Sequence, residues 1–489
     1  MTKLAGGTAH PRLAAFRWPA AGAGLLLLAC LAGAIITVVP SSMLALALSA
    51  LLLVAVIAVH PAVGAYVLIA VTPLVAGIDR GLAIPLLRPN EALLVLVGVA
   101  LLLRGTVRAV SGSPAKVTLD TMDLSLLLLA FTSSVVPLVW LLVRGHPIEQ
   151  DDVLYAVMMW KYYGIYLVAR ASIRTRRQVR KCLAISMAAA SVVAVVAVFQ
   201  SLHLFGVAQA LATYYAPYGD TGAVLNNRGG STLALPIAVA DLMTFNLAIA
   251  VGLLVRRLGS RPALLAMGML FVAGALAAGE FSGAIGLGLG IVTMAVVTRK
   301  VRTMAGFLPV LLIAGLALRP VVERRLEGFG SASGLPESWS GRLYNLTNYF
   351  WPTLFSDGNF ILGVQPAARV STSTMSLGYI WIESGYTWLL WSGGIPLILA
   401  FLYFLWVGIR GHLSAARSRD DVVGAAALAV VVALVVIGVL MIIDPHLTYR
   451  GSADLLFILL GLVAADRRRT ADDPYRPLRP PRLEGSSTT

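Results

Sequence analysis

The sequence predicts an all-α protein, a polytopic helical bundle that crosses a membrane about twelve to fourteen times. Two observations predict this fold class. Hydrophobic residues make up 58% of the 489 residues and charged residues only 12%, whereas soluble proteins carry roughly 25% charge. Mean hydropathy is +0.84, and apolar runs of about 18 residues, enough for a helix to span the hydrocarbon core, recur along the chain.

The apolar runs, about fourteen in number, predict the membrane helices. They cover residues 20–39, 41–59, 61–78, 89–103, 124–143, 153–173, 183–203, 232–255, 262–279, 283–298, 304–318, 385–409, 422–443 and 453–465. Four of these runs are short for a spanning helix, so the lower estimate is about twelve membrane helices. We predict one transmembrane domain over residues 1–469, with a large extracytoplasmic loop inserted at 319–384. Residues 470–489, rich in proline and arginine, are expected to form a disordered cytoplasmic tail.

The net charge of +15 does not indicate nucleic-acid binding, because its distribution follows the membrane. With the N-terminus inside, 27 of the 38 lysine and arginine residues lie at predicted cytoplasmic ends. This bias is the positive-inside rule, and it predicts that both termini are cytoplasmic. The Ala-, Gly-, Val- and Arg-rich composition indicates a bacterial plasma membrane. The lipid bilayer is therefore an expected partner and nucleic acid is not.

The arginines on the predicted outer side run against that rule. They are Arg80, Arg88, Arg144, Arg228, Arg319, Arg324, Arg325, Arg342, Arg369 and Arg450. One interpretation is solvated loop charge. As a set, they favour an anionic ligand at the outer face, because the guanidinium fork matches phosphate oxygens two at a time.

Aromatic residues accompany these arginines in the 319–384 loop. The faces of Trp339, Trp351 and Trp381 suit the apolar C–H surface of a sugar ring. The alternative is an interfacial aromatic belt, which explains Trp388 and Trp391 better than it explains the loop tryptophans.

Charges inside predicted spans require partners, because a charge at mid-bilayer costs about 2.5–3.5 kcal/mol on insertion scales. Lys161 and Asp241 are such charges, and we expect them to pair within the bundle. A proton relay is the alternative. Gly286 and Gly290 form a small-residue face that lets helices approach closely. Cys30 lies within the first predicted span and Cys182 at a predicted cytoplasmic end, so the two cannot pair; no disulfide framework or metal site is expected, and no cofactor.

Several short motifs stand out along the chain: Ser340-Gly-Arg342, PTLFSDGNFILGV at 352–364, Glu383-Ser-Gly-Tyr, Trp388-Leu-Leu-Trp-Ser-Gly-Gly394-Ile-Pro, and Asn227-Arg228-Gly-Gly-Ser-Thr followed by Pro236. Together these motifs resemble those of the O-antigen ligase and O-antigen polymerase superfamily. The resemblance covers residues 220–410 best.

The resemblance implies a polytopic glycosyltransferase of the C-type membrane architecture. Such enzymes take a glycan from a polyprenyl-diphosphate carrier at the outer face and pass it to a lipid core or to another carrier-linked glycan, without metal or nucleotide sugar. By position, Arg228 and Arg342 would hold the diphosphate, with Arg450, Arg88 and Arg369 in the same set. The ligases carry a histidine before the Glu-Xaa-Gly motif. Residues 374–378 contain none, which favours a polymerase.

A base that accepts the acceptor's proton would assist such a transfer. Glu383 is one candidate. His446 is another, with Asp444 orienting it and Arg450 reaching the diphosphate. A tight polar turn is the plainer interpretation of residues 444–450.

Two other function classes stay open. A flippase for lipid-linked oligosaccharides, or another transporter, shares the span count but predicts symmetric halves, which the one-sided loop opposes. A non-catalytic scaffold or sensor of cell-wall assembly would tolerate loss of the outer arginines. A cell-shape glycosyltransferase of the peptidoglycan type would need an outer aspartate motif, and the surroundings of Asp357 do not match one.

Overall fold

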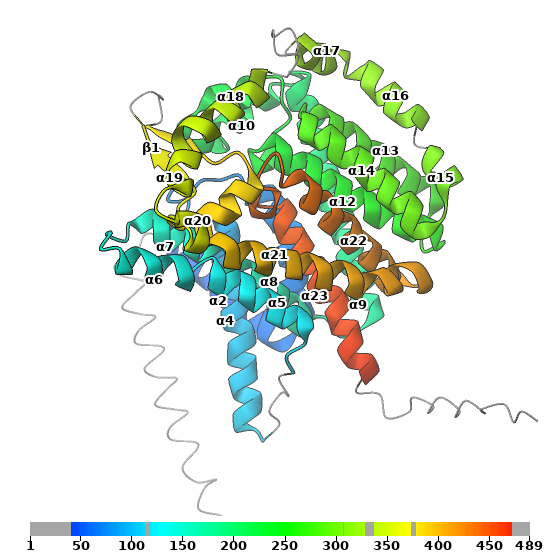
Figure 1. Cartoon of the computed structure of the whole chain (residues 1–489). Helices are drawn as coiled ribbons and strands as arrows, with labels where there is room; N and C mark the ends of the chain where they lie inside the picture. The colour runs from blue at the N-terminus through cyan, green and yellow to red at the C-terminus, as the bar shows by residue number, and fades with distance from the viewer. Residues whose placement is uncertain (1–40, 113–117, 307, 328–336, 373–377, 472–489) are drawn as a thin grey trace, which may run out of the picture.

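The computed structural model describes residues 41–112, 118–306, 308–327, 337–372 and 378–471, which are almost entirely helical (Figure 1). Within these ranges, seven helices are long and apolar enough to cross a membrane. They are α4 (Pro89–Val110), the consecutive α5 (Thr121–Thr132) and α6 (Val135–Val143), α9 (Arg176–Ser201), α12 (Pro236–Val255), α14 (Phe281–Thr298), α21 (Gly385–Ser418) and α22 (Val422–Leu440). The chain is thus an all-α, multi-pass membrane protein.

Other helices occupy further predicted runs. They are α2 (Ser41–Val59), α3 (Pro61–Val75), α8 (Met158–Ser172), α13 (Arg261–Ala277), α16 (Leu308–Ala317) and α23 (Ser452–Ala471). Short elements join them: α7 (Gln150–Ala156), α10 (Val207–Tyr214), η1 (Pro217–Gly219), α11 (Thr221–Leu225), η2 (Ser231–Leu233), α15 (Val301–Ala305) and η4 (His446–Thr448). The run predicted at 20–39, Cys30 within it, and residues 472–489 of the predicted tail lie outside the described residues.

The helices α12 and α22 form the centre of the bundle and are buried along nearly their whole length. Small residues let their neighbours approach. A Cβ on Gly290 of α14 would lie 2.7 Å from Thr244, and one on Gly286 would lie 2.9 Å from Leu440. The packing interpretation of these two glycines is therefore confirmed.

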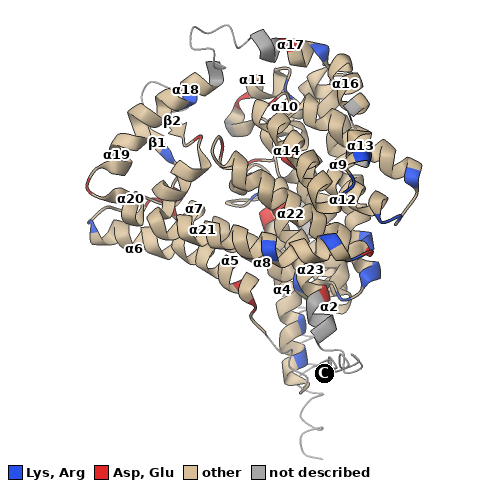
Figure 2. Cartoon of the chain, turned by 45° about the vertical axis from the view of Figure 1, so that its right-hand side comes forward, with Lys and Arg blue, Asp and Glu red and all other residues tan. Residues whose placement is uncertain are grey.

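Polar contacts at the two ends of the bundle join segments predicted to lie on the same side. Arg256 donates hydrogen bonds to the carbonyls of Ala416 (2.5 Å) and Arg419 (2.7 Å), all in segments predicted on one side. Arg342 pairs with Asp444, both predicted on the other. Figure 2 shows lysine and arginine at several helix ends. We call the end that carries the 319–384 segment the loop end.

The described part of the 319–384 segment is a chain of short elements rather than an irregular loop (Figure 1). It contains α17 (Arg319–Glu327), α18 (Glu337–Asn345), the π-helix η3 (Leu346–Phe350), α19 (Trp351–Phe355), α20 (Asn359–Leu362), β1 (Arg369–Ser371) and β2 (Tyr379–Trp381). The strands β1 and β2 pair antiparallel with Val370 opposite Ile380. The segment therefore has enough structure of its own to position side chains.

This segment is anchored in a break of α21. Gly394 has φ +65°, which interrupts the helix, and a Cβ there would lie 2.3 Å from the carbonyl oxygen of Ile361. A Cβ on Gly363 would lie 2.8 Å from the nitrogen of Gly393. The amide of Val364 donates to the carbonyl of Trp391 at 2.7 Å. Only glycine permits so close an approach of two backbones, so we call this contact the glycine anchor.

Candidate functional site

Arg342 of α18 is the centre of a charged cluster at the loop end. Its Nη1 lies 2.8 Å from Oδ2 of Asp444, and its Nε lies 3.9 Å from Oε1 of Glu383. Burial lowers the pKa of Arg342, but Asp444 and Glu383 outweigh burial and raise it, so this guanidinium stays charged. The short contact fixes Arg342 on Asp444, while the long one leaves Glu383 free to exchange partners.

Glu383 is the reachable carboxylate of this cluster. Its side chain keeps 42% exposure, against 2% for Asp444. It precedes Ser384, whose hydroxyl caps the first turn of α21 by accepting from the amide of Thr387. Partial burial raises the pKa of Glu383, and Asp444 and Glu280 raise it further against the opposite effect of Arg342. An exposed carboxyl with a raised pKa suits proton transfer.

Arg228 joins the cluster through Glu280. Its Nη1 lies 3.2 Å from Oε1 of Glu280, and Glu280 also interacts electrostatically with Arg342 and Glu383. Gly279 has φ +63°, which turns the chain sharply from α13 into α14 and places Glu280 at the turn. The amide of Gly229 donates to the carbonyl of Ala277 at 2.9 Å and fixes Arg228 beside it. We call Arg228, Glu280, Arg342, Glu383 and Asp444 the Arg342 cluster.

The partner of His446 differs from the expected one. Nδ1 of His446 lies 2.7 Å from Oδ2 of Asp241 on α12, whereas the side chain of Asp444 contacts Arg342. The prediction that Asp444 orients His446 is therefore wrong. The ring of His446 is fully buried against Tyr449, and its Nε2 has no hydrogen-bond partner among the described residues. His446 lies next to the cluster but is closed to a large substrate.

The expected Lys161–Asp241 pair is also wrong. Lys161 lies in the first turn of α8, and its ammonium is 3.8 Å from Asp454 of α23. Asp241 pairs with His446 instead. The charges are thus neutralised near helix ends at the loop end, rather than by each other in the middle of the bundle.

The remaining arginine candidates divide among separate places. Arg88 and Arg450 both lie near Asp79, at 3.6 Å and 3.5 Å. Arg369 forms an ion pair with Asp151 and stacks over the ring of Tyr379 at 3.9 Å. Arg228 and Arg342 therefore meet in one cluster, Arg88 and Arg450 in another, and Arg369 belongs to the β1–β2 hairpin.

The three tryptophans proposed for a glycan lie on the loop segment and are partly exposed. Trp339 is on α18, one turn before Arg342. The indole of Trp351 donates to the hydroxyl of Thr387 at 3.3 Å, and Trp381 contacts Tyr379 on β2 with ring centroids 6.5 Å apart. Trp388 and Trp391 are buried in the core. The loop tryptophans thus differ from these two in keeping accessible surface.

Sequence reasoning missed Glu280 and the role of Asp241. Glu280 is a carboxylate between two apolar runs on the same predicted side as Arg228, so topology alone could have identified it. The partner of Asp241 could not be identified, because it depends on which helices are neighbours. Among the described residues, no group of three or more His, Cys, Asp or Glu side chains has the arrangement of a metal site. Comparison with family models, curated proteins and solved structures finds no match to this chain.

Proposed function

We propose that the chain is a glycosyltransferase that polymerises a glycan from a polyprenyl-diphosphate carrier at the outer face of a bacterial plasma membrane. In this proposal both termini are cytoplasmic, the bundle has about twelve to fourteen spans, and the loop end faces outward. One observation carries it: Arg342, Glu383 and Asp444 lie together with Glu280 and Arg228, although they come from distant parts of the chain. The resemblance to the O-antigen polymerase and ligase superfamily supports the same assignment.

The proposed chemistry uses these groups in defined roles. The acceptor hydroxyl attacks the anomeric carbon of the donor glycan, the bond from that carbon to the diphosphate oxygen breaks, and the lipid diphosphate leaves. Glu383 accepts the hydroxyl proton. Arg342 and Arg228 bind the diphosphate and stabilise the charge that develops on it, which is usually the largest catalytic effect. Glu383 is 3.9 Å from Arg342, so a diphosphate oxygen can replace it there.

A transporter of lipid-linked glycans is the second candidate, favoured by the break in α21. Gly394 lies nine residues inside this helix, roughly 14 Å from its start at 1.5 Å per residue. Broken helices at such depth form substrate sites in many transporters. Here the backbone of Ile361 and Leu362 fills the break, which supports a structural role for it and favours the enzyme.

Purified protein with a lipid-linked oligosaccharide as both donor and acceptor tests the proposal. Arg342→Lys keeps the charge but loses the bidentate fork, and Arg228→Ala removes the second cation. We expect both to reduce chain growth at least tenfold. Arg319→Ala is the matched control, because its side chain is 72% exposed and its ion pair within the described part of the chain is with Glu323, one turn away. Unchanged glycan length in both cluster variants would refute the proposal.

Transport is separated from transfer in the same preparation. Reconstituted vesicles that move the lipid across the bilayer without lengthening the glycan would establish the second candidate instead.

A further inference from the structure

A second charged network lies at the loop end, beside α8. Its cations are Arg80, Arg88, Lys161 and Arg450, and its carboxylates are Asp79, Glu91 and Asp454. Four cations against three carboxylates leave one positive charge. The Arg342 cluster has the opposite balance, with two guanidinium groups against three carboxylates. Of the two, this network, which we call the Lys161 network, is the better electrostatic match for an anion.

Most ion pairs of the Lys161 network are too long to be hydrogen bonds. Arg80 and Glu91 form a bidentate pair at 2.8 and 3.1 Å. The Lys161–Asp454 pair is 3.8 Å and the Arg450–Asp79 pair is 3.5 Å. Donors at such distances are attracted by the carboxylates but not satisfied by them.

Arg450 provides an independent sign of a missing acceptor. The residue is 8% exposed, and its Nη1 has no hydrogen-bond partner among the described residues. A buried guanidinium nitrogen without an acceptor is costly. Oxygen atoms of a phosphate group would satisfy this nitrogen.

Helix N-termini in the Lys161 network also favour a bound anion. Glu91 and Asp454 lie in the first turns of α4 and α23, so two helix N-termini belong to the network. The partial positive charge of helix N-termini favours a bound anion.

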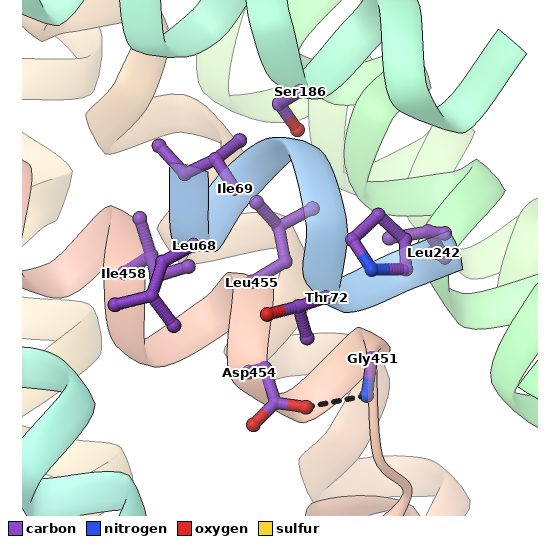
Figure 3. Close-up of a pocket in the computed structure, with 10 residues that line it drawn as sticks. Leu68, Ile69, Thr72, Ser186, Leu242, Gly451, Asp454, Leu455 and Ile458 are labelled. Carbon is purple, nitrogen blue, oxygen red and sulfur yellow. Dashed lines mark hydrogen bonds between the residues drawn. The ribbon is translucent and has the colours of Figure 1, made fainter. Parts of the chain in front are cut away.

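A small cavity beneath the network is not itself the ligand site. Its volume of about 10 Å³ is close to the least that holds a single water molecule. Thr72 and Asp454 are in its lining, and both have a side-chain oxygen without a hydrogen-bond partner among the described residues. Figure 3 shows them, with Asp454 also accepting from the amide of Gly451 at 2.6 Å.

We infer that Lys161, Arg450 and Arg88 form a second anion site, which takes the phosphate or diphosphate group of a membrane lipid. The site is separate from the Arg342 cluster, and the segment from Asp444 to Gly451 connects the two. The identification of the bound lipid as the acceptor of a polymerisation rests on the proposed function. The binding of an anion at this site does not depend on it.

The inference is tested by the number of polyprenyl diphosphate molecules that bind to the intact purified protein. Native mass spectrometry and titration measure this number. We expect two equivalents on the wild type. Lys161→Gln and Arg450→Gln should weaken the second equivalent at least tenfold, while Lys161→Arg should retain it. Arg228→Ala should weaken the first equivalent alone. Arg88→Gln provides a milder variant at the rim, and thermal unfolding of each variant checks its fold.

Inorganic pyrophosphate in a parallel titration distinguishes a lipid from a soluble ligand. Displacement only at large excess identifies the lipid as the ligand, while displacement at equal concentration assigns the site to a free phosphate compound. A single equivalent, unaffected by Lys161→Gln and Arg450→Gln, overturns the inference and leaves the proposed function intact. If binding depends on Lys161 but chain growth survives Arg342→Lys and Arg228→Ala, the inference stands and the proposed function is refuted.

Discussion

The Arg342–Asp444 pair allows the energetic role of the cluster to be predicted in numbers. Nη1 of Arg342 and Oδ2 of Asp444 are 2.8 Å apart, and the two side chains keep 16% and 2% exposure. At an effective dielectric constant of roughly 20, charges at this distance attract by about 6 kcal/mol. Desolvation offsets part of that attraction. We therefore expect a coupling energy of about 3 kcal/mol, within the range measured for close charge pairs.

A double-mutant cycle measures this coupling. Arg342→Ala, Asp444→Ala and the double variant are unfolded with SDS in mixed micelles, and the unfolding free energies are compared. Arg342→Ala should be the more destabilising single change, about 3–5 kcal/mol, because it leaves a buried carboxylate unpaired. Asp444→Ala should cost less, since Arg342 retains Glu383 at 3.9 Å.

The control cycle uses Arg319 and Glu323. Their side chains are 2.6 Å apart but 72% and 51% exposed, so solvent screens their attraction and the coupling should be too small to resolve. If the two cycles gave equal coupling energies, burial would not be the source of the interaction in the Arg342 cluster, and the reasoning would be wrong.

Three further predictions concern acid–base chemistry, the anchor and the opposite end. Burial raises the pKa of Glu383 above its ordinary value of 4.5, and a base must be deprotonated. The rate of the proposed transfer should therefore rise with pH, and the midpoint of this rise should lie above pH 4.5. In Glu383→Gln the rise should disappear. If the variant kept the same pH dependence, Glu383 would be excluded as the base. Gly394→Ala should lower the free energy of unfolding by about 1–3 kcal/mol, because alanine is strained at the φ of this position. Gly341→Ala is the control and should not be destabilised, since a Cβ there meets nothing within 4 Å. Thermal unfolding in detergent compares the two variants. Arg170→Ala leaves Asp123, fully buried, without its partner and should cost about 3–5 kcal/mol; an unfolding free energy within 1 kcal/mol of wild type would contradict this.

The architecture was predictable because lipid imposes a length and a polarity on each helix. Apart from 20–39, outside the described residues, each predicted run corresponds to a helix or a pair of consecutive helices. The boundaries were less predictable. The run predicted at 385–409 becomes a helix that continues to Ser418, because hydropathy detects where the membrane ends and not where the helix ends. Breaks such as that at Gly394 depend on a distant segment and leave little local signal.

The site was predictable where topology sufficed. Arg342, Glu383 and Arg228 were selected from motifs on one predicted side, and the structure places them in one cluster. The pairings failed where neighbours in space decide. Asp444 and His446 are two residues apart, yet the turn at η4 directs the first toward α18 and the second toward α12. Sequence proximity cannot reveal this divergence.

The glycine anchor has a consequence for engineering. It fastens the loop segment to α21 through main-chain atoms of Val364 and Trp391. The side chains of Trp391 and Ser392 add hydrogen bonds to the carbonyls of Ala367 and Pro366, and none of these residues belongs to α18 or α19. The aromatic surface of α18 and α19 can therefore be redesigned, or exchanged for that of another chain, while the attachment point is kept. Under the proposed function, grafting of this kind offers a way to alter which sugars are accepted without rebuilding the membrane bundle.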